Sequence, residues 1–365
     1  MSNTVTAGVF RPGTGLALEE LNVAAPGPGL VEVELRATGV CHSDLHVLDG
    51  AWPAESPLVM GHEGAGVVRR IGKGVDQVTP GTHVVLSWFA PCRRCRNCAA
   101  GKAWLCTGTT ALANTLPDGG SPFTDSSGAR VDPYLGLGTF SGTVVVPESA
   151  LVPVPEEIPF SVGALMGCSV TTGVGAVLNT ATVRPGESAV VFGCGGVGLA
   201  VVMGLSLVGA GPIVAVDLSE ERLERAREFG ATVTLNPRTD DVAAVLQERF
   251  SGVDYAFEAI GNPGVISTLG SVLAPGGAAV LVGMTAVGAT ATIDPFDLAD
   301  QGKRILGCNY GSSVAAVDVP RLARLFLDGK LPLDRLISSE RPLGELSAAV
   351  EELRAGEGLR SVLVP

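Results

Sequence analysis

Hydrophobic and polar positions alternate with a period of two over roughly the first 150 residues of the chain. The clearest stretches are VEVELRATGV (31–40), GAGVVRRIG (64–72) and GTHVVLSW (81–88). Successive side chains of a strand point to opposite faces, so this pattern predicts half-buried β-strands. Glycine and proline between the stretches mark turns. The N-terminal part is therefore expected to be rich in β-structure.

Residues 107–142 interrupt this pattern because they are polar, rich in glycine and only weakly periodic. Connections of this length within a compact domain are uncommon and often functional. We expect a long surface excursion, which can contain a hairpin, that closes over a site.

From about Pro153 to Cys308 short hydrophobic stretches alternate with helical patterns. The predicted strands are SAVVFG (188–193), PIVAVD (212–217), ATVTLN (231–236), VDYAFEAI (253–260) and AAVLVGM (278–284). One helix is predicted at 219–230, capped by Ser219 and ended by Gly230, and another at 240–250. Such alternation predicts a parallel, doubly wound sheet in an α/β fold. The remaining residues predict helices at 319–331 and 343–357 and a closing strand at 359–365.

The segment from Ser188 to Val216 contains no charged residue and is long enough to span a bilayer. However, it carries several glycines and Pro212, and it divides into a strand, a glycine turn, an apolar segment and a second strand. A buried βαβ unit explains this pattern better than a membrane helix.

Length and charge exclude several classes of protein. At 365 residues the chain is long enough for two domains with real cores, and its net charge is −12. This acidic balance argues against a nucleic-acid partner and against an anionic membrane surface. The N-terminal MSNTVTAGVF lacks the features of a signal peptide, so we expect a reducing, cytoplasmic location.

The strongest cofactor signal is FGCGGVG at 192–198, which places Gly193, Gly195 and Gly198 in the G-x-G-x-x-G pattern. It follows a predicted strand and opens a helix, which is the context that a dinucleotide-binding turn requires. Gly193 permits the turn, Gly195 lets the backbone approach a pyrophosphate, and Gly198 lets helix and strand pack closely. Asp217 ends the next strand and should bind the adenosine ribose, which favours NAD over NADP.

Four of the eight cysteines lie close together as Cys92, Cys95, Cys98 and Cys106. Four thiolates from one loop suit a closed, tetrahedral zinc site with a structural role. An iron–sulfur cluster, disulfides and a zinc-ribbon module for nucleic acids are weaker alternatives.

Three further segments each offer a metal ligand beside glycine and polar residues: GVCHSDLH with Cys41, MGHEGAG with His62 and MGCSVTTG with Cys168. Each of these residues alone is more often a buried structural residue. Together with the glycine turn, however, two cysteines and a histidine with an open fourth position form the pattern of a catalytic zinc site.

These motifs, together with VVFGCGGVG, VAVD and the terminal GEGLRSV, make nearly the whole chain resemble the zinc-dependent medium-chain alcohol dehydrogenases. The long segment before GTFSG resembles the longer, typically dimeric members, so a homodimer is expected. Among bacterial relatives, the chain is similar to aryl and primary alcohol dehydrogenases and to the mycothiol-dependent branch that oxidises thiol adducts of formaldehyde. The resemblance implies a GroES-like catalytic domain (1–155 and 310–365) into which a Rossmann NAD-binding domain (156–309) is inserted.

The resemblance also implies a role for individual residues. Cys41, His62 and Cys168 would hold the catalytic zinc, with Glu63 behind the metal as a transient ligand and Asp44 accepting a hydrogen bond from His62. Ser43 would accept the alcohol proton and His46 would pass it to solvent. Further residues would contact NAD: His42, Gly196, Val197, Arg222 and Arg360.

The implied reaction is reversible hydride transfer between an alcohol and NAD, with two zinc ions per chain. The resemblance places Trp52, Trp88 and Tyr134 in the substrate pocket, which would suit an aromatic or allylic primary alcohol, although all three could be core or surface residues. A thiol-dependent formaldehyde dehydrogenase and an enzyme with permanently held NAD and an external acceptor remain open. A non-catalytic relative or a zinc-free reductase would lack the zinc ligands that this chain retains.

Overall fold

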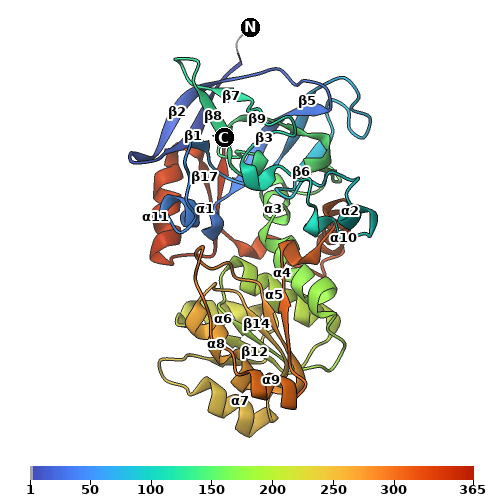
Figure 1. Ribbon diagram of the computed structural model, residues 1–365, viewed down its shortest axis with the longest axis vertical. Coiled ribbons are helices and arrows are strands. Elements are labelled where there is room, and N and C mark those ends of the chain that lie inside the picture. Colours follow the sequence, from blue (N-terminus) through green and yellow to red (C-terminus); the bar gives the residue numbers. More distant parts are fainter. Residues whose placement is uncertain (1–2) are drawn as a thin grey trace. The chain divides into compact units, whose positions relative to one another are not determined.

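The computed structural model describes residues 3–365, which form two compact units. Unit 1 comprises the chain up to Cys168 together with Val314–Pro365, and unit 2 is Ser169–Ser313. Unit 1 is rich in strands and unit 2 contains a parallel sheet flanked by helices, which confirms the α/β fold predicted from the sequence (Figure 1).

Unit 1 contains a small closed barrel and a seven-stranded sheet. The barrel strands, in spatial order, are β1 (Asn3–Arg11), β2 (Gly15–Val23), β7 (Phe123–Thr124), β8 (Arg130–Pro133) and β4 (Leu58–Val59). The sheet contains, in order, β10 (Leu151–Pro153), β6 (His83–Leu86), β5 (Glu63–Ile71), β3 (Leu30–Gly39), β18 (Arg360–Val364) and β17 (Ile337–Pro342), and β9 (Thr143–Pro147) pairs with β3. The helices of this unit are α1 (His42–Leu48), α2 (Arg96–Ala99), α3 (Phe160–Met166), α10 (Ala315–Leu327) and α11 (Leu346–Ala355).

The long segment 107–142 is only partly the surface excursion that we expected. Its second half forms the antiparallel β7–β8 hairpin and closes the barrel, and Phe123 and Val131 are completely buried. The expected hairpin is thus confirmed. The expectation of a surface excursion was wrong for this half, because Phe123 and Val131 pack in the core. The surrounding glycines and polar residues obscure this signal in the sequence.

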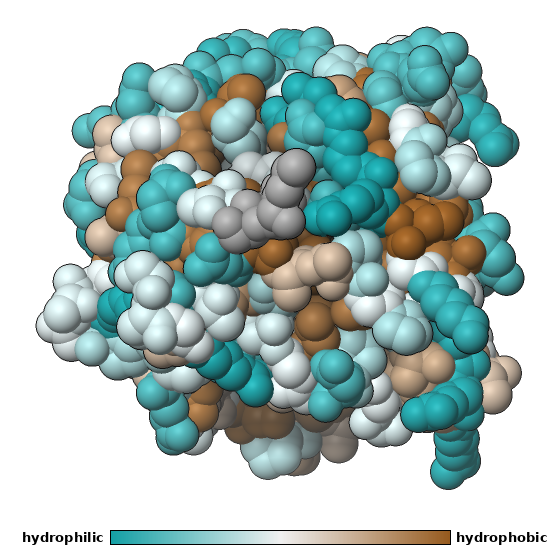
Figure 2. Space-filling model, turned by 90° about the horizontal axis from the view of Figure 1, so that it is seen from above, coloured by the Kyte–Doolittle hydropathy of each residue, from teal (hydrophilic) through white to brown (hydrophobic). Residues whose placement is uncertain are grey.

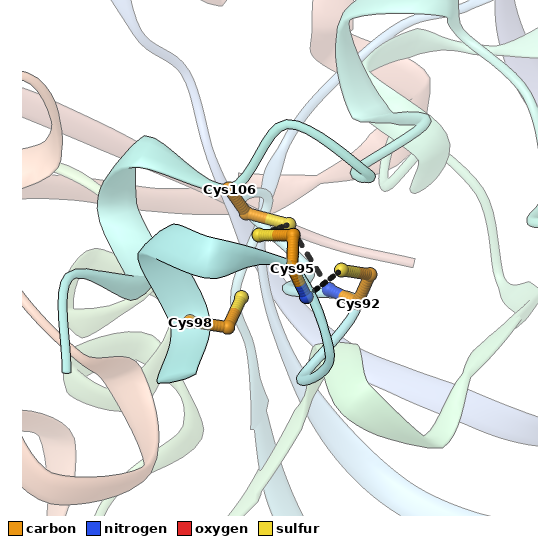
Figure 3. A group of neighbouring side chains, drawn as sticks. All are labelled: Cys92, Cys95, Cys98 and Cys106. Carbon is orange, nitrogen blue, oxygen red and sulfur yellow. Dashed lines mark hydrogen bonds between the residues drawn. The ribbon is translucent and has the colours of Figure 1, made fainter. Parts of the chain in front are cut away.

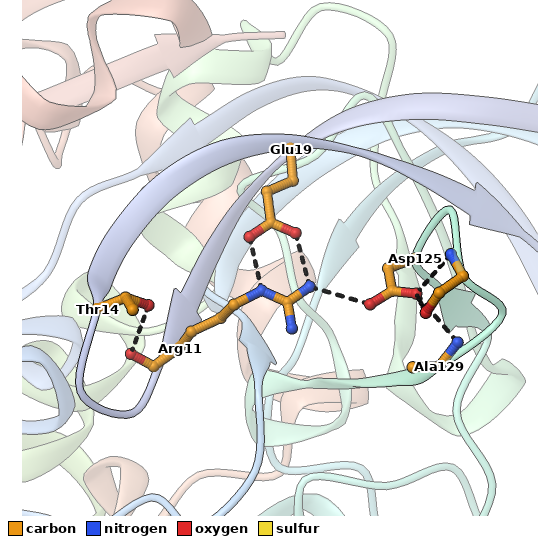
Figure 4. A network of polar contacts seen from close by, with 6 residues as sticks. Arg11, Thr14, Glu19, Asp125 and Ala129 are labelled. Atoms are coloured by element: carbon orange, nitrogen blue, oxygen red, sulfur yellow. Dashed lines mark hydrogen bonds and ion pairs between the residues drawn. The ribbon is translucent and has the colours of Figure 1, made fainter.

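An ion-pair network joins this hairpin to the hairpin of β1 and β2 (Figure 4). The guanidinium of Arg11 donates two hydrogen bonds of 2.8 Å to Glu19 and a third of 3.2 Å to Asp125. Asp125 in turn accepts a 3.0 Å hydrogen bond from the backbone N–H of Ala129. The bidentate pair fixes the Arg11 guanidinium within the β1–β2 hairpin, and the single bond to Asp125 connects the two turns.

Unit 2 is a six-stranded parallel sheet whose strand order β13-β12-β11-β14-β15-β16 is that of a dinucleotide-binding fold. Its strands are β11 (Ala189–Phe192), β12 (Ile213–Val216), β13 (Val233–Leu235), β14 (Val253–Glu258), β15 (Leu273–Leu281) and β16 (Arg304–Gly307). Its helices are α4 (Ser169–Gly175), the π-helix η5 (Ala176–Ala181), α5 (Gly196–Val208), α6 (Glu220–Glu228), α7 (Val242–Phe250), α8 (Pro263–Val272) and α9 (Pro295–Asp300). The charge-free segment is thus the predicted βαβ unit, formed by β11, α5 and β12.

The chain passes from unit 1 to unit 2 after Cys168 and returns to unit 1 after Ser313. The domain limits 1–155, 156–309 and 310–365 stay a prediction. Helix α3 belongs to unit 1 because it packs on β3 and β5. A Cβ atom on its Gly163 would lie 3.1 Å from the Cβ of Ala65, so helix and sheet are in close contact.

Hydrophilic residues cover most of the face seen in Figure 2, and hydrophobic residues occur between them in small groups. Within residues 3–365 no single helix is long and apolar enough to cross a membrane. The bent helix pair Phe160–Met166 and Ser169–Ala181 together has the length and composition for it.

Candidate active site

Four potential metal ligands meet in the core of unit 1. The ligand atoms of Cys41, His62, Glu63 and Cys168 all lie within 4.8 Å of one another, and all four side chains are buried. Cys41 directly precedes α1, His62 directly precedes β5, Glu63 is the first residue of β5, and Cys168 follows α3. Segments that are far apart in the sequence therefore converge on one point, as the three motifs predicted.

Glycine allows the backbone around these ligands to pack this closely. Gly61, next to His62, has φ +86°, and a Cβ there would lie 2.6 Å from the backbone nitrogen of Phe140. A Cβ on Gly167, next to Cys168, would lie 2.6 Å from the carbonyl oxygen of Leu86. Larger residues at either position would push a ligand out of the cluster.

The carboxylate of Asp44 is buried and contacts two of the ligand residues. Nδ1 of His62 lies 3.1 Å from Oδ1 of Asp44, and the backbone N–H of Cys41 donates a 2.9 Å hydrogen bond to Oδ2. Burial is the largest single influence on the pKa of His62 and lowers it. The charge of Asp44 and the hydrogen bonds with Asp44 and Cys41 together outweigh burial and raise that pKa above its usual range. Asp44 thus fixes the imidazole with its Nδ1–H toward the carboxylate.

The other ring nitrogen of His62 provides a test of whether the site suits a metal. Nε2 is buried and has no hydrogen-bond partner among the described residues. Buried polar atoms are nearly always paired, so an unpartnered nitrogen beside two thiols requires a ligand. One imidazole nitrogen and two sulfur atoms are the donor set of catalytic zinc sites, and the residues fit that ion.

Hydrogen bonding with Cys168 lowers the pKa of Cys41 well below its usual range, although burial opposes this, and the charge of Arg360 lowers it further. Metal ions bind the thiolate form of cysteine. The environment of the site therefore favours the ionised ligand.

Glu63 and Arg360 form a buried ion pair at the same site, in which Nη2 of Arg360 donates to a carboxylate oxygen of Glu63. Burial raises the pKa of Glu63 to about 7, although the charge of Arg360 opposes this rise. The sequence predicted a pyrophosphate contact for Arg360. The structure places its guanidinium against Glu63, and the pyrophosphate contact remains a prediction.

The predicted proton-relay residues lie on α1, immediately after Cys41. Ser43 and His46 are half-buried, whereas His42 is exposed. The His46 ring stacks on the indole of Trp52 with 4.5 Å between ring centres, and the backbone N–H of Trp52 donates to the His46 carbonyl. Trp52 therefore restricts the orientation of His46.

The three aromatic residues predicted for the substrate pocket share one apolar cluster with α1. Tyr134 is a buried member of that cluster, and Trp52 and Trp88 pack against it half-buried. The Tyr134 hydroxyl donates a 2.9 Å hydrogen bond to the carbonyl oxygen of Ser43. A surface hollow of about 740 Å³ elsewhere in unit 1, lined by residues such as Leu18, Arg341 and Val364, contains none of the predicted site residues.

The second metal-ligand group is the loop with four cysteines, in which all ligand atoms again lie within 4.8 Å of one another (Figure 3). Its four thiols are free, and the sulfur atoms of Cys95 and Cys106 are 3.9 Å apart, so no disulfide joins them. Backbone N–H groups of Cys98 and Thr107 lower the pKa of Cys95 to about 5. Four thiols without an open position fit a structural zinc ion.

Unit 2 provides the predicted dinucleotide turn. Gly193 follows β11 with φ +89°, and α5 begins at Gly196. A Cβ on Gly198 would lie 1.7 Å from the Gly193 carbonyl oxygen, so only glycine allows the helix to approach the turn. Gly195 and Val197 are partly exposed at the helix N-terminus, where backbone N–H groups can bind phosphate.

Asp217 lies at the carboxyl end of β12 beside this turn. Its Oδ2 accepts a 2.7 Å hydrogen bond from the backbone N–H of Cys194, and Oδ1 accepts one of 2.9 Å from Ser219. Arg222 follows in the first turn of α6 and is half-buried. The structure therefore brings the predicted glycines and Asp217 together.

Sequence reasoning missed Glu258, a completely buried residue at the end of β14. Its carboxylate accepts hydrogen bonds of 2.8–3.2 Å from the backbone N–H groups of Ile260, Gly261 and Asn262. Ile260 lies against Gly193 of the dinucleotide turn. The only signal in the sequence is an acidic residue at the end of an apolar strand, directly before a glycine-containing turn.

Comparison with known proteins adds independent information on the family. Residues 27–156 match the model for an alcohol dehydrogenase GroES-like domain, and residues 196–328 match that for a zinc-binding dehydrogenase. The chain is 38 % identical to S-(hydroxymethyl)glutathione dehydrogenase of Paracoccus denitrificans over 99 % of both chains. The chain belongs to the zinc-dependent medium-chain alcohol dehydrogenase family.

Two solved structures of this dehydrogenase family match over the full length. An alcohol dehydrogenase zinc-binding domain protein from Burkholderia ambifaria has a TM-score of 0.95 at 36 % identity and covers 100 % of both chains. Benzyl alcohol dehydrogenase from Acinetobacter calcoaceticus has a TM-score of 0.92 at 33 % identity and covers 99 % of both chains. The predicted fold, family and enzyme class are thus confirmed, and the two cysteine-containing clusters both have side chains that could hold a metal ion.

Proposed function

We propose that this dehydrogenase transfers hydride reversibly between a primary alcohol, aromatic or allylic in type, and NAD. The observation that carries the proposal is the buried group of Cys41, His62 and Cys168 with an unpartnered Nε2 at its centre. Ser43 and His46 lie on α1, directly after Cys41, where they can move a proton between substrate and solvent.

Cys41, His62 and Cys168 would hold the catalytic zinc, which as a Lewis acid makes an alcohol proton easier to remove. The hydroxyl of Ser43 would accept that proton and at the same time release its own proton to the relay. His46, one helical turn further along and stacked on Trp52, passes the proton on. Asp44 keeps His62 in the tautomer that leaves Nε2 free for the metal.

NAD would be the hydride acceptor, bound with its phosphates at the Gly193–Gly198 turn. The carboxylate of Asp217 is held by two backbone N–H groups, so it is placed to bind ribose hydroxyls and to repel a 2′-phosphate. We expect kcat/KM for NAD to exceed that for NADP, and Asp217→Ser to narrow the difference by lowering the value for NAD.

The preference for aromatic or allylic alcohols rests on the apolar cluster around α1, which includes Trp52, Trp88 and Tyr134. Such surroundings favour a flat, apolar substrate over a polyol. The similarity to a benzyl alcohol dehydrogenase is in keeping with this class.

A second candidate substrate is the adduct of formaldehyde with a thiol. The observation that favours it is the 38 % identity to an S-(hydroxymethyl)glutathione dehydrogenase. The same zinc-ligand group and the same proton path would serve either substrate, since both present a primary hydroxyl group.

The deciding experiment follows NADH formation spectrophotometrically with benzyl alcohol, cinnamyl alcohol, ethanol and sorbitol, and with formaldehyde plus glutathione or mycothiol. Turnover of benzyl and cinnamyl alcohol without a thiol supports the main proposal. Turnover only when formaldehyde and a thiol are both present selects the second candidate. A metal assay in parallel should find two zinc ions per chain, and one zinc would contradict the two-site assignment.

A further inference from the structure

Tyr134 connects the long segment 107–142 to two residues of the candidate active site. Its hydroxyl donates a 2.9 Å hydrogen bond to the Ser43 carbonyl oxygen. Its ring and that of His62 form a T-shaped contact, with 5.7 Å between ring centres and an angle of 86° between the ring planes. This is a favourable aromatic geometry, and Tyr134 is only 2 % exposed.

The backbone next to Tyr134 adopts an unfavourable conformation. Leu135 has φ +51°, a region that bulky residues rarely enter. Its N–H donates a 2.8 Å hydrogen bond to the side-chain oxygen of Asn114, which itself has φ +55°. Such strain persists only where surrounding contacts enforce it, and it concentrates at functional sites.

The element that receives the Tyr134 hydrogen bond is short. Helix α1 has only seven residues, so contacts outside the helix must decide its orientation. Asp44 provides one such contact through Cys41 and His62. The Tyr134 hydroxyl provides another, at the backbone of the residue that would accept the alcohol proton.

We infer that Tyr134 is a positioning residue that holds Ser43 in place for proton transfer, and that Asn114 holds Tyr134 in turn. The inference rests on the proposed function, since Ser43 matters only if the chain oxidises alcohols.

The test replaces Tyr134 by Phe, which removes the hydroxyl and keeps the ring. Tyr255→Phe is the matched control, because Tyr255 is a buried tyrosine of unit 2. We expect Tyr134→Phe to lower kcat about tenfold, since small displacements of reacting groups cost this much or more. The solvent deuterium isotope effect on kcat should rise, while zinc content and the KM for NAD stay unchanged.

A second measurement does not depend on activity. Hydrogen exchange of the α1 amides should become about two- to tenfold faster in Tyr134→Phe, the effect of one lost hydrogen bond. Asn114→Ala should also lower kcat and speed the exchange of the α1 amides. Asn114→Asp should give values close to those of the wild type, because it retains the acceptor oxygen.

Unchanged kcat, isotope effect and α1 exchange in Tyr134→Phe would overturn the inference. A lower melting temperature with unchanged kcat and isotope effect would also overturn it, because it would indicate a merely structural role. A wild-type enzyme that forms no NADH with any alcohol or adduct would instead contradict the proposed function, and α1 exchange would then decide whether Tyr134 holds the helix.

Discussion

Oδ1 of Asp44 lies 3.1 Å from Nδ1 of His62, and neither side chain is exposed to solvent by more than 1 %. The second oxygen of the same carboxylate accepts the backbone N–H of Cys41. One buried carboxylate thus aligns two candidate zinc ligands from distant parts of the chain, Cys41 directly before α1 and His62 directly before β5. The ligand geometry therefore depends on a residue that is not itself a ligand.

Asp44→Asn should weaken zinc binding at this site about 10- to 100-fold, the usual effect of losing a hydrogen-bond partner behind a ligand histidine. An amide carries no charge and can turn its NH2 group toward the ring, so it no longer selects the tautomer. Chelator competition measures the change, and the cysteine-loop zinc provides an internal reference. Equal loss of both zinc ions would argue for general destabilisation instead.

The cysteine loop should depend on its metal for folding. Its regular structure is limited to the four-residue helix α2 and one short 3-10 turn, so zinc binding must supply most of its order. Cys98→Ser should remove one zinc per chain and make trypsin cleavage at Arg94, Arg96 and Lys102 about tenfold faster or more, because these exposed residues lose a fixed backbone.

Ala99→Ser serves as the control for this experiment, because it makes a similar change at an exposed position of the same helix. It should retain both zinc ions and resist trypsin as the wild type does. A Cys98→Ser protein that retains two zinc ions would rule out the loop as a four-thiolate site.

The sequence was most informative where the chemistry needs a fixed spacing or a particular residue type. Cys92–Cys106 and the Gly193 turn are local patterns, so their roles could be predicted without the fold. Cys41, His62 and Cys168 are distant in the chain but each lies in a distinctive motif. The grouping of these three residues could be predicted from the motifs. The contact between Glu63 and Arg360 could not, because any buried carboxylate could have been the partner of Arg360.

Other features depend on packing that no local pattern encodes. The contact between Tyr134 and Ser43 joins the long segment 107–142 to helix α1 through a side chain and a carbonyl oxygen. The edge strand β16 was not predicted, since three of its four residues are exposed and the period-two pattern is absent. The boundary after Cys168 depends on α3 packing against unit 1 rather than on a change in composition.

Glu258 should make unit 2 less stable as the pH rises. Burial raises its pKa above the ordinary value of 4.5, although the N–H groups of Asn262, Gly261 and Ile260 oppose this. With rising pH the unfolded chain loses the proton first, so unfolding becomes easier between the ordinary and the raised pKa. Glu258→Gln removes this titrating carboxyl group. The free energy of unfolding of the wild type minus that of the variant should therefore decrease from pH 4 toward neutral pH.

Urea unfolding followed by circular dichroism at several pH values measures this advantage. Glu157→Gln, a change of an exposed glutamate, should give a difference that is independent of pH. An advantage of wild type over Glu258→Gln that grows with pH would mean that the folded state favours the ionised carboxylate.

Ser43→Ala tests the proton path directly and should lower kcat about 10²- to 10⁴-fold, the range for loss of an acid–base group. Tyr134 contacts the carbonyl of residue 43 rather than its hydroxyl, so alanine leaves that hydrogen bond and α1 in place. Zinc content and NAD affinity should therefore stay near the wild-type values, and Ser43→Thr, which keeps a hydroxyl, should recover much of the activity. Rapid turnover by Ser43→Ala would show that the alcohol proton leaves by another route, and His46 with its stacked Trp52 would then have to receive it without Ser43.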